Sequence, residues 1–339
     1  MKKYKVAIVG ATGAVGLEMI RMLECRKFPI ENIKFLASER SIGKNLTFNN
    51  KEIAVELLTK DSGKGIDVAL FSAGSEISKK VAPFFAADGC FVIDNSSAWR
   101  MDKNVPLVVP EVNPNDLNKN KKIIANPNCS TIQMVVALKP LHNFAKIKRV
   151  IVSTYQSVSG AGQKGINELT DQVKAWAKGE ILPQPNKFQY QIAFNLIPQI
   201  DIFTENGYTK EEMKMTSETK KIMNDNSIEV SATCIRVPVF RSHSESVWIE
   251  TEELLSPQKA KELLSQAEGI QLLDDPENKK YPMPLCAENM QTTYVGRIRT
   301  DISTKNNALT FWIVSDNLLK GSALNAVQIA ETLVKKGFL

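Results

Sequence analysis

The chain has 339 residues, of which 43% are hydrophobic and 24% are charged. This composition is that of a globular protein and excludes a small disulfide scaffold, a collagen-like chain and a mostly disordered one. The 43 basic and 37 acidic residues leave a net charge of +6 that is dispersed along the chain. Such a thin surplus gives little support to nucleic-acid binding, so we expect no nucleic-acid partner.

The five cysteines are odd in number, far apart and without a C-x-x-C pair. This pattern predicts reduced thiols in a cytoplasmic protein. Only two histidines, His142 and His243, are present, and no Cys/His cluster has ligand spacing, so we expect no metal site. No run reaches the ~18 apolar residues of a membrane span. Glycines interrupt the apolar N-terminal stretch, which is therefore interpreted as structure and not as a signal peptide.

The first part of the chain alternates short apolar runs with segments of helical periodicity. Helices are expected from Val15 onward and over 76–87. The expected strands are 5–9, 33–37, 68–71, 91–94, 107–109 and 123–125. This alternation predicts an α/β domain of Rossmann type, with a mostly parallel sheet covered on both faces.

After residue 130 the pattern becomes richer in strands. Helices are expected through Leu138, near 163–178 and near 209–224, and strand-like runs are 149–154, 229–239, 247–252, 293–299 and 308–314. These runs predict a second α+β domain with a mixed or antiparallel sheet. A last helix at about 321–336 is expected to pack on the first domain. The expected boundaries are therefore 1–129 completed by 316–339, and 130–315.

Three glycines separate the first expected strand from the first helix, in the run GATGAVG over residues 10–16. At this position a dinucleotide phosphate meets backbone N–H groups and the positive end of a helix. The spacing G-x-x-G-x-x-G is less common than G-x-G-x-x-G, and a plain tight turn is the alternative interpretation. Because a strand precedes and a helix follows, we predict nucleotide binding.

The second strand ends in Ser38-Glu39-Arg40-Ser41. An acidic residue at this position binds the 2′-hydroxyl of NAD, whereas guanidinium and hydroxyl groups suit the 2′-phosphate of NADP. Glu39 therefore favours NAD, and Arg40 with its flanking serines favours NADP. We predict NADP, with Arg40 as a solvated loop residue as the alternative.

The segment Asn126-Pro127-Asn128-Cys129 opens a helix directly after an expected strand. Pro127 keeps the helix from starting earlier, and unsatisfied N–H groups at a helix N-terminus favour a thiolate. Cys129 is therefore the predicted nucleophile. The other four cysteines are interpreted as small buried hydrophobic residues; they are Cys25, Cys90, Cys234 and Cys286.

A thiolate that attacks a carbonyl needs a proton shuttle, for which only two imidazoles exist. His142 is expected at a helix end or in a loop with a structural role. His243 ends a strand-like run, and the residues alone leave a catalytic base and a surface residue equally open. Likewise, Arg100 fits an ordinary surface arginine, and Glu218 with Lys221 fits an exposed ion pair on one helix face.

Eight motifs occur in order between residues 10 and 243: GATGAVG, SSAWR, VPEVN, NPNCST, STYQSVSGAG, NLIPQID, ETKK and RVPVFRSH. Together they resemble the aspartate-semialdehyde dehydrogenase family over essentially the whole chain. The glycine motif is shared by many nucleotide-binding folds, but NPNCST together with YQSVSGAG and R-x₆-H is narrow.

The resemblance implies that Cys129 forms an acyl-enzyme thioester, that His243 is the acid/base and that Gln156 positions the substrate. Arg236 would bind the substrate α-carboxylate in bidentate geometry, and Glu218 would bind the α-ammonium.

The resemblance also implies the groups for the remaining parts of the ligands. Lys221 and Arg100 would hold the phosphate. The implied NADP site consists of Gly10, Thr12, Gly13, Ala14, Val15, Ser38, Arg40, Ser41, Ser159, Gly160 and Asn317.

The implied reaction is the reversible reductive dephosphorylation of L-aspartyl-4-phosphate to L-aspartate 4-semialdehyde by NADPH, on the route to lysine, methionine and threonine. The implied partners are these small molecules and further copies of the chain, in a homodimer or homotetramer joined through the second domain. Two alternatives are an N-acetyl-γ-glutamyl-phosphate reductase and a catalytically inactive NADPH-binding regulator. The first usually has its cysteine in H-P-G-C, which differs from the segment here, and the joint presence of Cys129 and His243 argues against the second.

Overall fold

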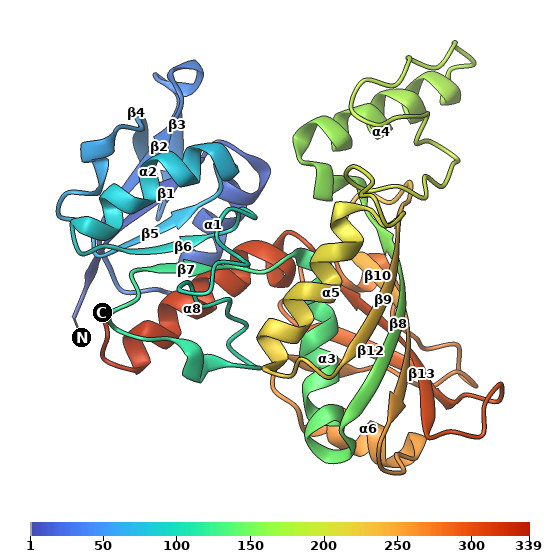
Figure 1. The fold of residues 1–339 in the computed structure, drawn as a ribbon. Coiled ribbons are helices and arrows are strands. Elements are labelled where there is room, and N and C mark those ends of the chain that lie inside the picture. Colours follow the sequence, from blue (N-terminus) through green and yellow to red (C-terminus); the bar gives the residue numbers. More distant parts are fainter. Residues whose placement is uncertain (1) are drawn as a thin grey trace. The chain divides into compact units, whose positions relative to one another are not determined.

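The computed structural model describes residues 2–339, which form two compact units. The first unit comprises Met1–Asn128 with Ser322–Leu339, and the second comprises Cys129–Gly321. The C-terminal segment therefore returns to the unit in which the chain begins (Figure 1).

The first unit is built on a seven-stranded sheet of order β3-β4-β2-β1-β5-β6-β7. Its strands are β1 (Tyr4–Val9), β2 (Ile30–Ala37), β3 (Asn45–Phe48), β4 (Lys51–Leu57), β5 (Val68–Phe71), β6 (Phe91–Asp94) and β7 (Ile123–Ala125). All pairs are parallel except β3 with β4. The order places β1 between β2 and β5, so the carboxyl end of β1 lies where ligands bind in doubly wound sheets.

Three α-helices belong to the first unit: α1 (Ala14–Cys25), α2 (Ser75–Ala87) and α8 (Leu324–Lys335). The final helix packs against α1, where Arg26 makes an ion pair of 2.7 Å with Glu331. All four residues of β5 and of β6 are buried, as expected for parallel strands covered on both faces.

The second unit contains a six-stranded mixed sheet of order β11-β12-β13-β10-β8-β9. Its strands are β8 (Ile147–Gln156), β9 (Glu229–Arg236), β10 (His243–Thr251), β11 (Ile270–Leu272), β12 (Thr293–Thr300) and β13 (Ala308–Ser315). Its helices are α3 (Cys129–Ala145), α4 (Gln163–Ala177), α5 (Lys210–Met223), α6 (Pro257–Gln266) and α7 (Pro284–Ala287). The parallel pairs are β8 with β9 and β11 with β12, and the predicted two-domain α/β and α+β architecture is confirmed.

The sheet of the second unit is covered by α3, α5 and α6; α3 contacts both other helices, and all three contact the strands. Because side chains alternate between the faces of a strand, His243 and Glu245 of β10 lie on the same face. Gln133 of α3 donates a hydrogen bond to the carbonyl oxygen of His243, and its side chain also acts on the carboxyl of Glu245, so α3 covers this face.

The structure differs from the expected elements in three places. Residues 107–109 form no strand, and Leu107 makes a single bridge to Ala125. Pro106 and Pro110 flank this run and lack the N–H groups that would extend a ladder. The hairpin of β3 and β4 was not predicted, because its strands carry mostly exposed side chains and so lack an apolar run.

The third difference concerns α3, which continues to Ala145 and includes Pro140. His142 therefore lies in the last turn of the helix, at the helix end where it was expected. Its Nδ1 accepts a hydrogen bond of 3.2 Å from the N–H of Ile147, and its Nε2 lies 3.6 Å from a carboxylate oxygen of Asp225. Extensive burial of this helix compensates the hydrogen bond that a proline removes.

The cysteines are only partly as predicted. Cys90 and Cys234 are buried, and burial raises the pKa of both thiols, which makes them inert. Cys25 is exposed and Cys286 is half-buried, so the interpretation of these two as buried residues is wrong. Over residues 2–339 no helix is long and apolar enough to cross a membrane, and no group of three or more His, Cys, Asp or Glu side chains is arranged to hold a metal ion.

Candidate active site

The glycine motif forms the turn between β1 and α1. Gly10 has a φ of +83°, and a Cβ there would overlap the carbonyl oxygen of Ser72. A Cβ on Gly16 would overlap the carbonyl oxygen of Gly10. At Gly13 a Cβ would lie 3.4 Å from the same oxygen and φ is −81°, so the protein itself does not exclude a side chain there. The absence of a side chain at Gly13 instead suits the close approach of a ligand.

The N-terminus of α1 is open to an anion. Gly13 is its N-cap and provides no side-chain cap, and the first turn contains no acidic residue. The hydroxyl groups of Thr12 and Ser41 lie 3.1 Å apart, so the glycine turn and the segment after β2 meet. Ser38 and Arg40 are exposed beside Ser41. These predicted cofactor residues therefore lie together at the carboxyl end of β1.

Arg100 is buried, with 8% of its surface exposed, so the interpretation as a surface arginine is wrong. Its Nε donates to the carbonyl oxygen of Asn126 at 3.0 Å, and its Nη2 donates to that of Asn95 at 2.8 Å. Asn126 begins the segment that leads to Cys129, so Arg100 fixes the start of that segment.

Cys129 is the first residue of α3, as predicted, and it is half-buried. A Cβ on Gly321 would lie 2.9 Å from the Cβ of Cys129, so the chain before α8 packs directly on the nucleophile and tolerates only glycine there. The thiol is therefore not sealed in the apolar core, and it stands at a helix N-terminus, where the helix dipole favours negative charge.

Arg236 ends β9 and is buried, and burial lowers the pKa of its guanidinium. The charges of Glu211 and Cys129 act in the opposite direction on this pKa, which places both groups near Arg236. Arg236 also donates through Nη1 to the carbonyl oxygen of Ser157 at 2.7 Å. The structure thus brings the predicted carboxylate-binding arginine near the predicted nucleophile.

His243 is fully buried and begins β10, so its interpretation as the end of the preceding run is wrong. Burial and the neighbouring Arg236 guanidinium hold the pKa of His243 well below its ordinary value, so the imidazole is neutral. A Cβ on Gly160 would lie 2.8 Å from Nη1 of Arg236 and 3.2 Å from Nε2 of His243. Both side chains therefore pack closely against Gly160, where a side chain would collide with them.

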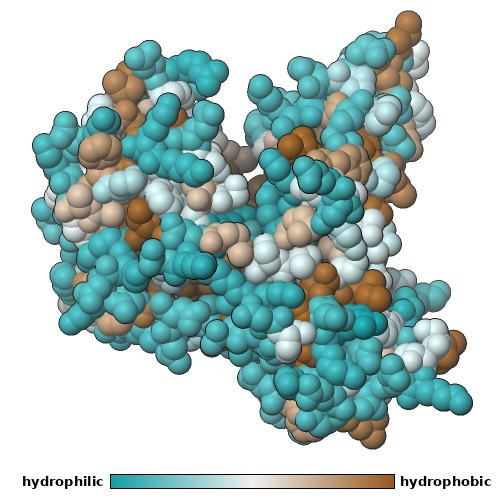
Figure 2. All heavy atoms as spheres, in the orientation of Figure 1, coloured by the Kyte–Doolittle hydropathy of each residue, from teal (hydrophilic) through white to brown (hydrophobic). Residues whose placement is uncertain are grey.

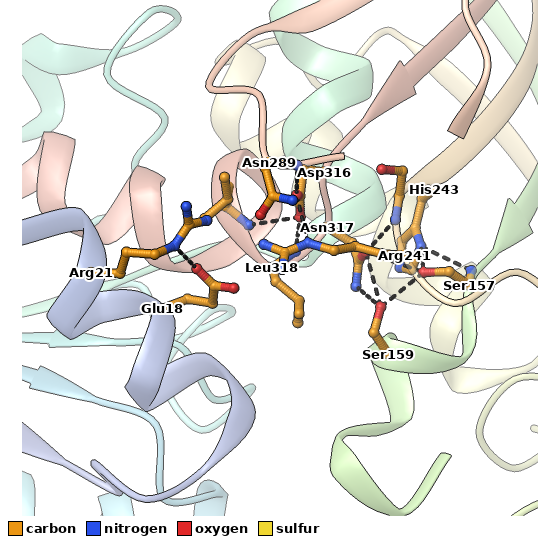
Figure 3. Close-up of polar contacts among 12 residues, drawn as sticks. Glu18, Arg21, Ser157, Ser159, Arg241, His243, Asn289, Asp316, Asn317 and Leu318 are labelled. Atoms are coloured by element: carbon orange, nitrogen blue, oxygen red, sulfur yellow. Dashed lines mark hydrogen bonds and ion pairs between the residues drawn. The ribbon is translucent and has the colours of Figure 1, made fainter. Parts of the chain in front are cut away.

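A set of polar side chains lies on the other side of the His243 ring (Figure 3). Ser157, Ser159 and Asn317 are joined there by hydrogen bonds of 3.0 to 3.2 Å and are almost fully buried. Asn317 also accepts a hydrogen bond of 2.9 Å from the N–H of Ser242. Of this set only Ser157 contacts the ring, with its backbone nitrogen and its hydroxyl each 3.1 Å from Nδ1 of His243, so two predicted cofactor residues, Ser159 and Asn317, lie beside that contact.

Gln156 ends β8 beside Arg236, its partner in the parallel register. It is buried, and its amide nitrogen donates to a carboxylate oxygen of Glu211 at 3.3 Å. Glu211 also pairs with Lys214 at 3.1 Å, and Lys214 pairs with Asp201 at 2.9 Å. A charged chain therefore extends from α5 to the ends of β8 and β9.

Glu218 and Lys221 lie one turn apart on α5. Glu218 is buried, with 1% of its surface exposed, and Lys221 is half-buried, so the interpretation as an exposed ion pair is wrong. The helix begins at the predicted capping box, in which Thr209 and Glu212 satisfy each other's backbone N–H groups.

Four residues near these groups were not predicted: Ser157, Glu211, Glu245 and Gly321. Ser157 and Gly321 matter for where their backbone lies, which the sequence does not reveal. Glu211 resembles any acidic residue in the first turn of a helix, so the sequence does not single it out either. Glu245 had a usable signal, because it lies two residues after His243 and alternation places both on one face.

The fold and the residues near Cys129 define a two-domain dehydrogenase with a nucleotide-binding unit and a thiol-containing unit. Two family models match the chain: the semialdehyde dehydrogenase NAD-binding domain over residues 5–120 and the semialdehyde dehydrogenase dimerisation domain over residues 138–320. The chain belongs to the aspartate-semialdehyde dehydrogenase family.

Individual relatives are similar along their whole length. The aspartate-semialdehyde dehydrogenase of Aquifex aeolicus is 59% identical over 99% of both chains, and that of Bacillus subtilis is 51% identical over 97% of both. The crystal structure of aspartate semialdehyde dehydrogenase II from Vibrio cholerae complexed with ASA has a TM-score of 0.96 and 49% identity over 99% of both chains. The Candida albicans enzyme with NADP has a TM-score of 0.78 and 25% identity over 100% of both chains.

Proposed function

We propose that this protein converts L-aspartyl-4-phosphate to L-aspartate 4-semialdehyde with NADPH, reversibly, through a thioester on Cys129. The observation that carries the proposal is the placement of Cys129 at the N-terminus of α3 within electrostatic reach of Arg236, which itself adjoins His243. The names of the relatives and of the ASA complex support the same substrate class.

The first chemical step belongs to Cys129. Its thiolate attacks the acyl carbon, a C–S bond forms, and the C–O bond to phosphate breaks, which releases inorganic phosphate. NADPH, when bound, supplies the hydride that reduces the thioester. The C–S bond then breaks as the aldehyde forms, and His243, protonated to the imidazolium when it takes the thiol proton of Cys129, returns that proton to the sulfur.

The charged side chains that the family resemblance implies match a substrate with two anionic ends and one cationic group. Arg236 is the proposed partner of the α-carboxylate, because a guanidinium binds a carboxylate through two parallel hydrogen bonds. Glu218 is the proposed partner of the α-ammonium, and Lys221 and Arg100 those of the phosphate. A buried Glu218 disfavours a substrate whose nitrogen is acetylated, since an amide offers no charge to compensate the carboxylate.

The β1–α1 turn fits the phosphates of a dinucleotide. The uncapped N-terminus of α1 offers backbone N–H groups, and Gly13 leaves room for close approach. Arg40 and Ser41 are the proposed partners of a 2′-phosphate, which favours NADP over NAD. The relative with NADP supports this choice.

A steady-state assay in the reverse direction tests the proposal. We expect phosphate-dependent reduction of NADP by L-aspartate 4-semialdehyde, slower reduction of NAD, and no turnover of N-acetyl-glutamate semialdehyde. Cys129→Ala should abolish the reaction and Cys25→Ala, on the exposed end of α1, should retain it. Activity confined to the acetylated aldehyde, or full activity of Cys129→Ala, would contradict the proposal.

A further inference from the structure

Three buried polar side chains of the second unit carry hydrogen-bonding atoms that the proposed reaction does not use. Glu245 of β10, Thr154 of β8 and Gln133 of α3 are each 0% exposed. Within residues 2–339 no hydrogen-bond partner is present for either carboxyl oxygen of Glu245, for Oγ1 of Thr154 or for Oε1 of Gln133. Buried polar atoms in folded proteins are nearly always hydrogen-bonded, to protein or to ordered water, so these four oxygen atoms require an explanation.

The strand register brings two of the three side chains together. Glu245 lies directly opposite Thr154 in the antiparallel pair of β10 with β8. Residues directly opposite share one face of the sheet, with Cβ atoms about 4.5–5.5 Å apart, a separation that one bridging molecule can span. On the other side of Glu245 the register partner in β13 is Ile313, which is apolar and offers no hydrogen bond.

Gln133 reaches the same place from α3. Its Nε2 donates to the carbonyl oxygen of His243 at 3.4 Å, and because a carbonyl oxygen only accepts, this contact fixes which end of the amide is the nitrogen. Burial raises the pKa of Glu245, and the side chain of Gln133 lies close enough to act against that rise. The amide of Gln133 therefore adjoins the carboxyl of Glu245, while its Oε1 still lacks a donor.

Cys234 is a further neighbour, and it does not satisfy these atoms. It lies opposite Thr154 in the parallel pair of β8 with β9. Its Sγ donates to Sδ of Met215 at 3.7 Å, and a thiol is a weak hydrogen-bonding group. A group other than a protein side chain is therefore needed to join Glu245, Thr154 and Gln133.

The chemistry of the atoms selects the ligand. A buried water molecule typically makes about three hydrogen bonds to otherwise unsatisfied polar groups. Here it can accept the proton of Glu245, which burial keeps neutral, donate to Oε1 of Gln133 and share a hydrogen bond with the Thr154 hydroxyl. A divalent cation would need roughly six or more oxygen ligands, which is more than these side chains supply.

We infer that Glu245, Thr154 and Gln133 bind one ordered water molecule, which joins β10, β8 and α3 by hydrogen bonds. The inference concerns a site that the proposed reaction does not include, and it holds whichever substrate the enzyme takes.

The water site lies directly behind the side chains of the proposed reaction. Thr154 precedes Gln156 by two residues on β8, and Glu245 follows His243 by two residues on β10, so each pair shares one face of its strand. The helix that completes the site, α3, begins at Cys129. The water therefore joins the three elements that also carry the proposed nucleophile, acid/base and substrate-positioning residue.

A crystal structure of the full-length enzyme that shows ordered water tests the inference directly. We expect one solvent peak within hydrogen-bond distance of a carboxyl oxygen of Glu245, of Oγ1 of Thr154 and of Oε1 of Gln133. Direct hydrogen bonds among the three side chains, with no peak between them, would overturn the inference. A peak with the short contacts and the larger ligand number of a cation would also overturn it.

Substitutions of Thr154 test the site in solution. Thr154→Val replaces the hydroxyl by a methyl group in a side chain of the same shape, and Thr154→Ser keeps the hydroxyl. Oxygen-17 magnetic relaxation dispersion counts long-lived internal water molecules, and it should give one fewer per chain in Thr154→Val and the native number in Thr154→Ser. The Tm of Thr154→Val should fall by a few degrees, because buried atoms of Glu245 and Gln133 lose their partner.

Thr233→Val is the matched control, since it makes the same replacement at an exposed position of the neighbouring strand β9. It should keep the native water count and the native Tm. Gln133→Met provides a second variant, which removes the acceptor on α3 and should lose the same water. A native water count in both Thr154→Val and Gln133→Met would overturn the inference.

Discussion

His243 and Glu245 lie on one face of β10, both fully buried, yet burial acts on them in opposite directions. It lowers the pKa of His243 and raises that of Glu245 well above its ordinary value. Neither carboxyl oxygen of Glu245 has a hydrogen-bond partner within residues 2–339. The nearby amide of Gln133 lowers the pKa of Glu245, but burial raises it by more. Both side chains are therefore held neutral, which costs stability when either must be charged.

The first prediction concerns the pH dependence of stability. Because its pKa is raised, Glu245 keeps a proton in the folded protein that it releases in the unfolded chain. The stability gained from this bound proton is complete below the ordinary pKa of a glutamate and is lost as the pH rises through the folded-state pKa. Glu245→Gln cannot ionise and should raise the Tm at pH 8 relative to the native protein, by roughly 2–4 °C for each kcal/mol recovered. Thermal unfolding at pH 5 and pH 8 measures this.

The control for Glu245→Gln is Glu277→Gln, which makes the same carboxylate-to-amide replacement at an exposed position. It should leave the difference in Tm between the two pH values as in the native protein. An equal Tm difference in Glu245→Gln and in the native protein would show that Glu245 does not titrate between these pH values.

The second prediction separates the two histidines. His243→Asn should lower kcat by roughly 10²-fold or more with cofactor binding intact, because it removes the proposed proton donor. His142→Asn is the matched control, since His142 lies in α3 and bonds to Ile147, away from the thiol end of the helix. We expect it to lower the Tm with kcat unchanged. Comparable kcat values in the two variants would argue against His243 as the donor.

The β1–α1 turn shows how one element combines structural and ligand-binding glycines. Gly10 needs its left-handed backbone and the absence of a Cβ against Ser72, whereas Gly13 needs neither. The two glycines of the same motif are therefore required for different reasons.

The third prediction follows from that difference. Gly10→Ala should destabilise the protein by about 2 kcal/mol or more, because the left-handed conformation and the overlap with Ser72 both penalise a side chain. Gly13→Ala should leave the Tm nearly unchanged and raise the KM for NADP about tenfold. Calorimetry and cofactor kinetics on both variants check this. An unchanged KM in Gly13→Ala would remove the cofactor from this turn.

Prediction of elements from the sequence succeeded where burial follows a regular pattern. The apolar runs of β5, β6 and β7 have the predicted bounds, since strands buried on both faces are continuously apolar. The hairpin of β3 and β4 was missed because few of its side chains are buried. The extension of α3 beyond Pro140 depends on packing around the whole helix, which no local pattern contains.

The second unit exposes large apolar side chains between α4 and α5, and Figure 2 shows hydrophobic surface in the region of α4. Those in the segment 181–203 are Ile181, Tyr190, Phe194, Leu196, Ile202 and Phe203, each more than half exposed. An exposed apolar patch of this kind is typical of a protein–protein interface, and the matching family model is a dimerisation domain. We propose that a second copy of the chain covers this segment.

The fourth prediction is a homodimer in solution. Sedimentation equilibrium should give twice the chain mass of 37.7 kDa. The double variant Ile181→Asp with Leu196→Asp should shift the protein toward monomer, because charges on the apolar segment oppose burial. Ile77→Asp, on α2 of the first unit, is the control and should leave the mass unchanged. A native protein that sediments as a monomer would contradict the proposal.

The sequence by itself determined the two-domain architecture and the family, and it placed Cys129, the proposed nucleophile, at a helix start, because these features depend on local periodicity, turn chemistry and motif order. Only the tertiary structure decided that Arg236 lies near Cys129 and that His243 is fully buried with a lowered pKa. It also decided that Glu218 and Glu245 are buried. These properties arise from burial and from hydrogen bonds between residues far apart along the chain, and they exist only once the strands pair and the helices cover them.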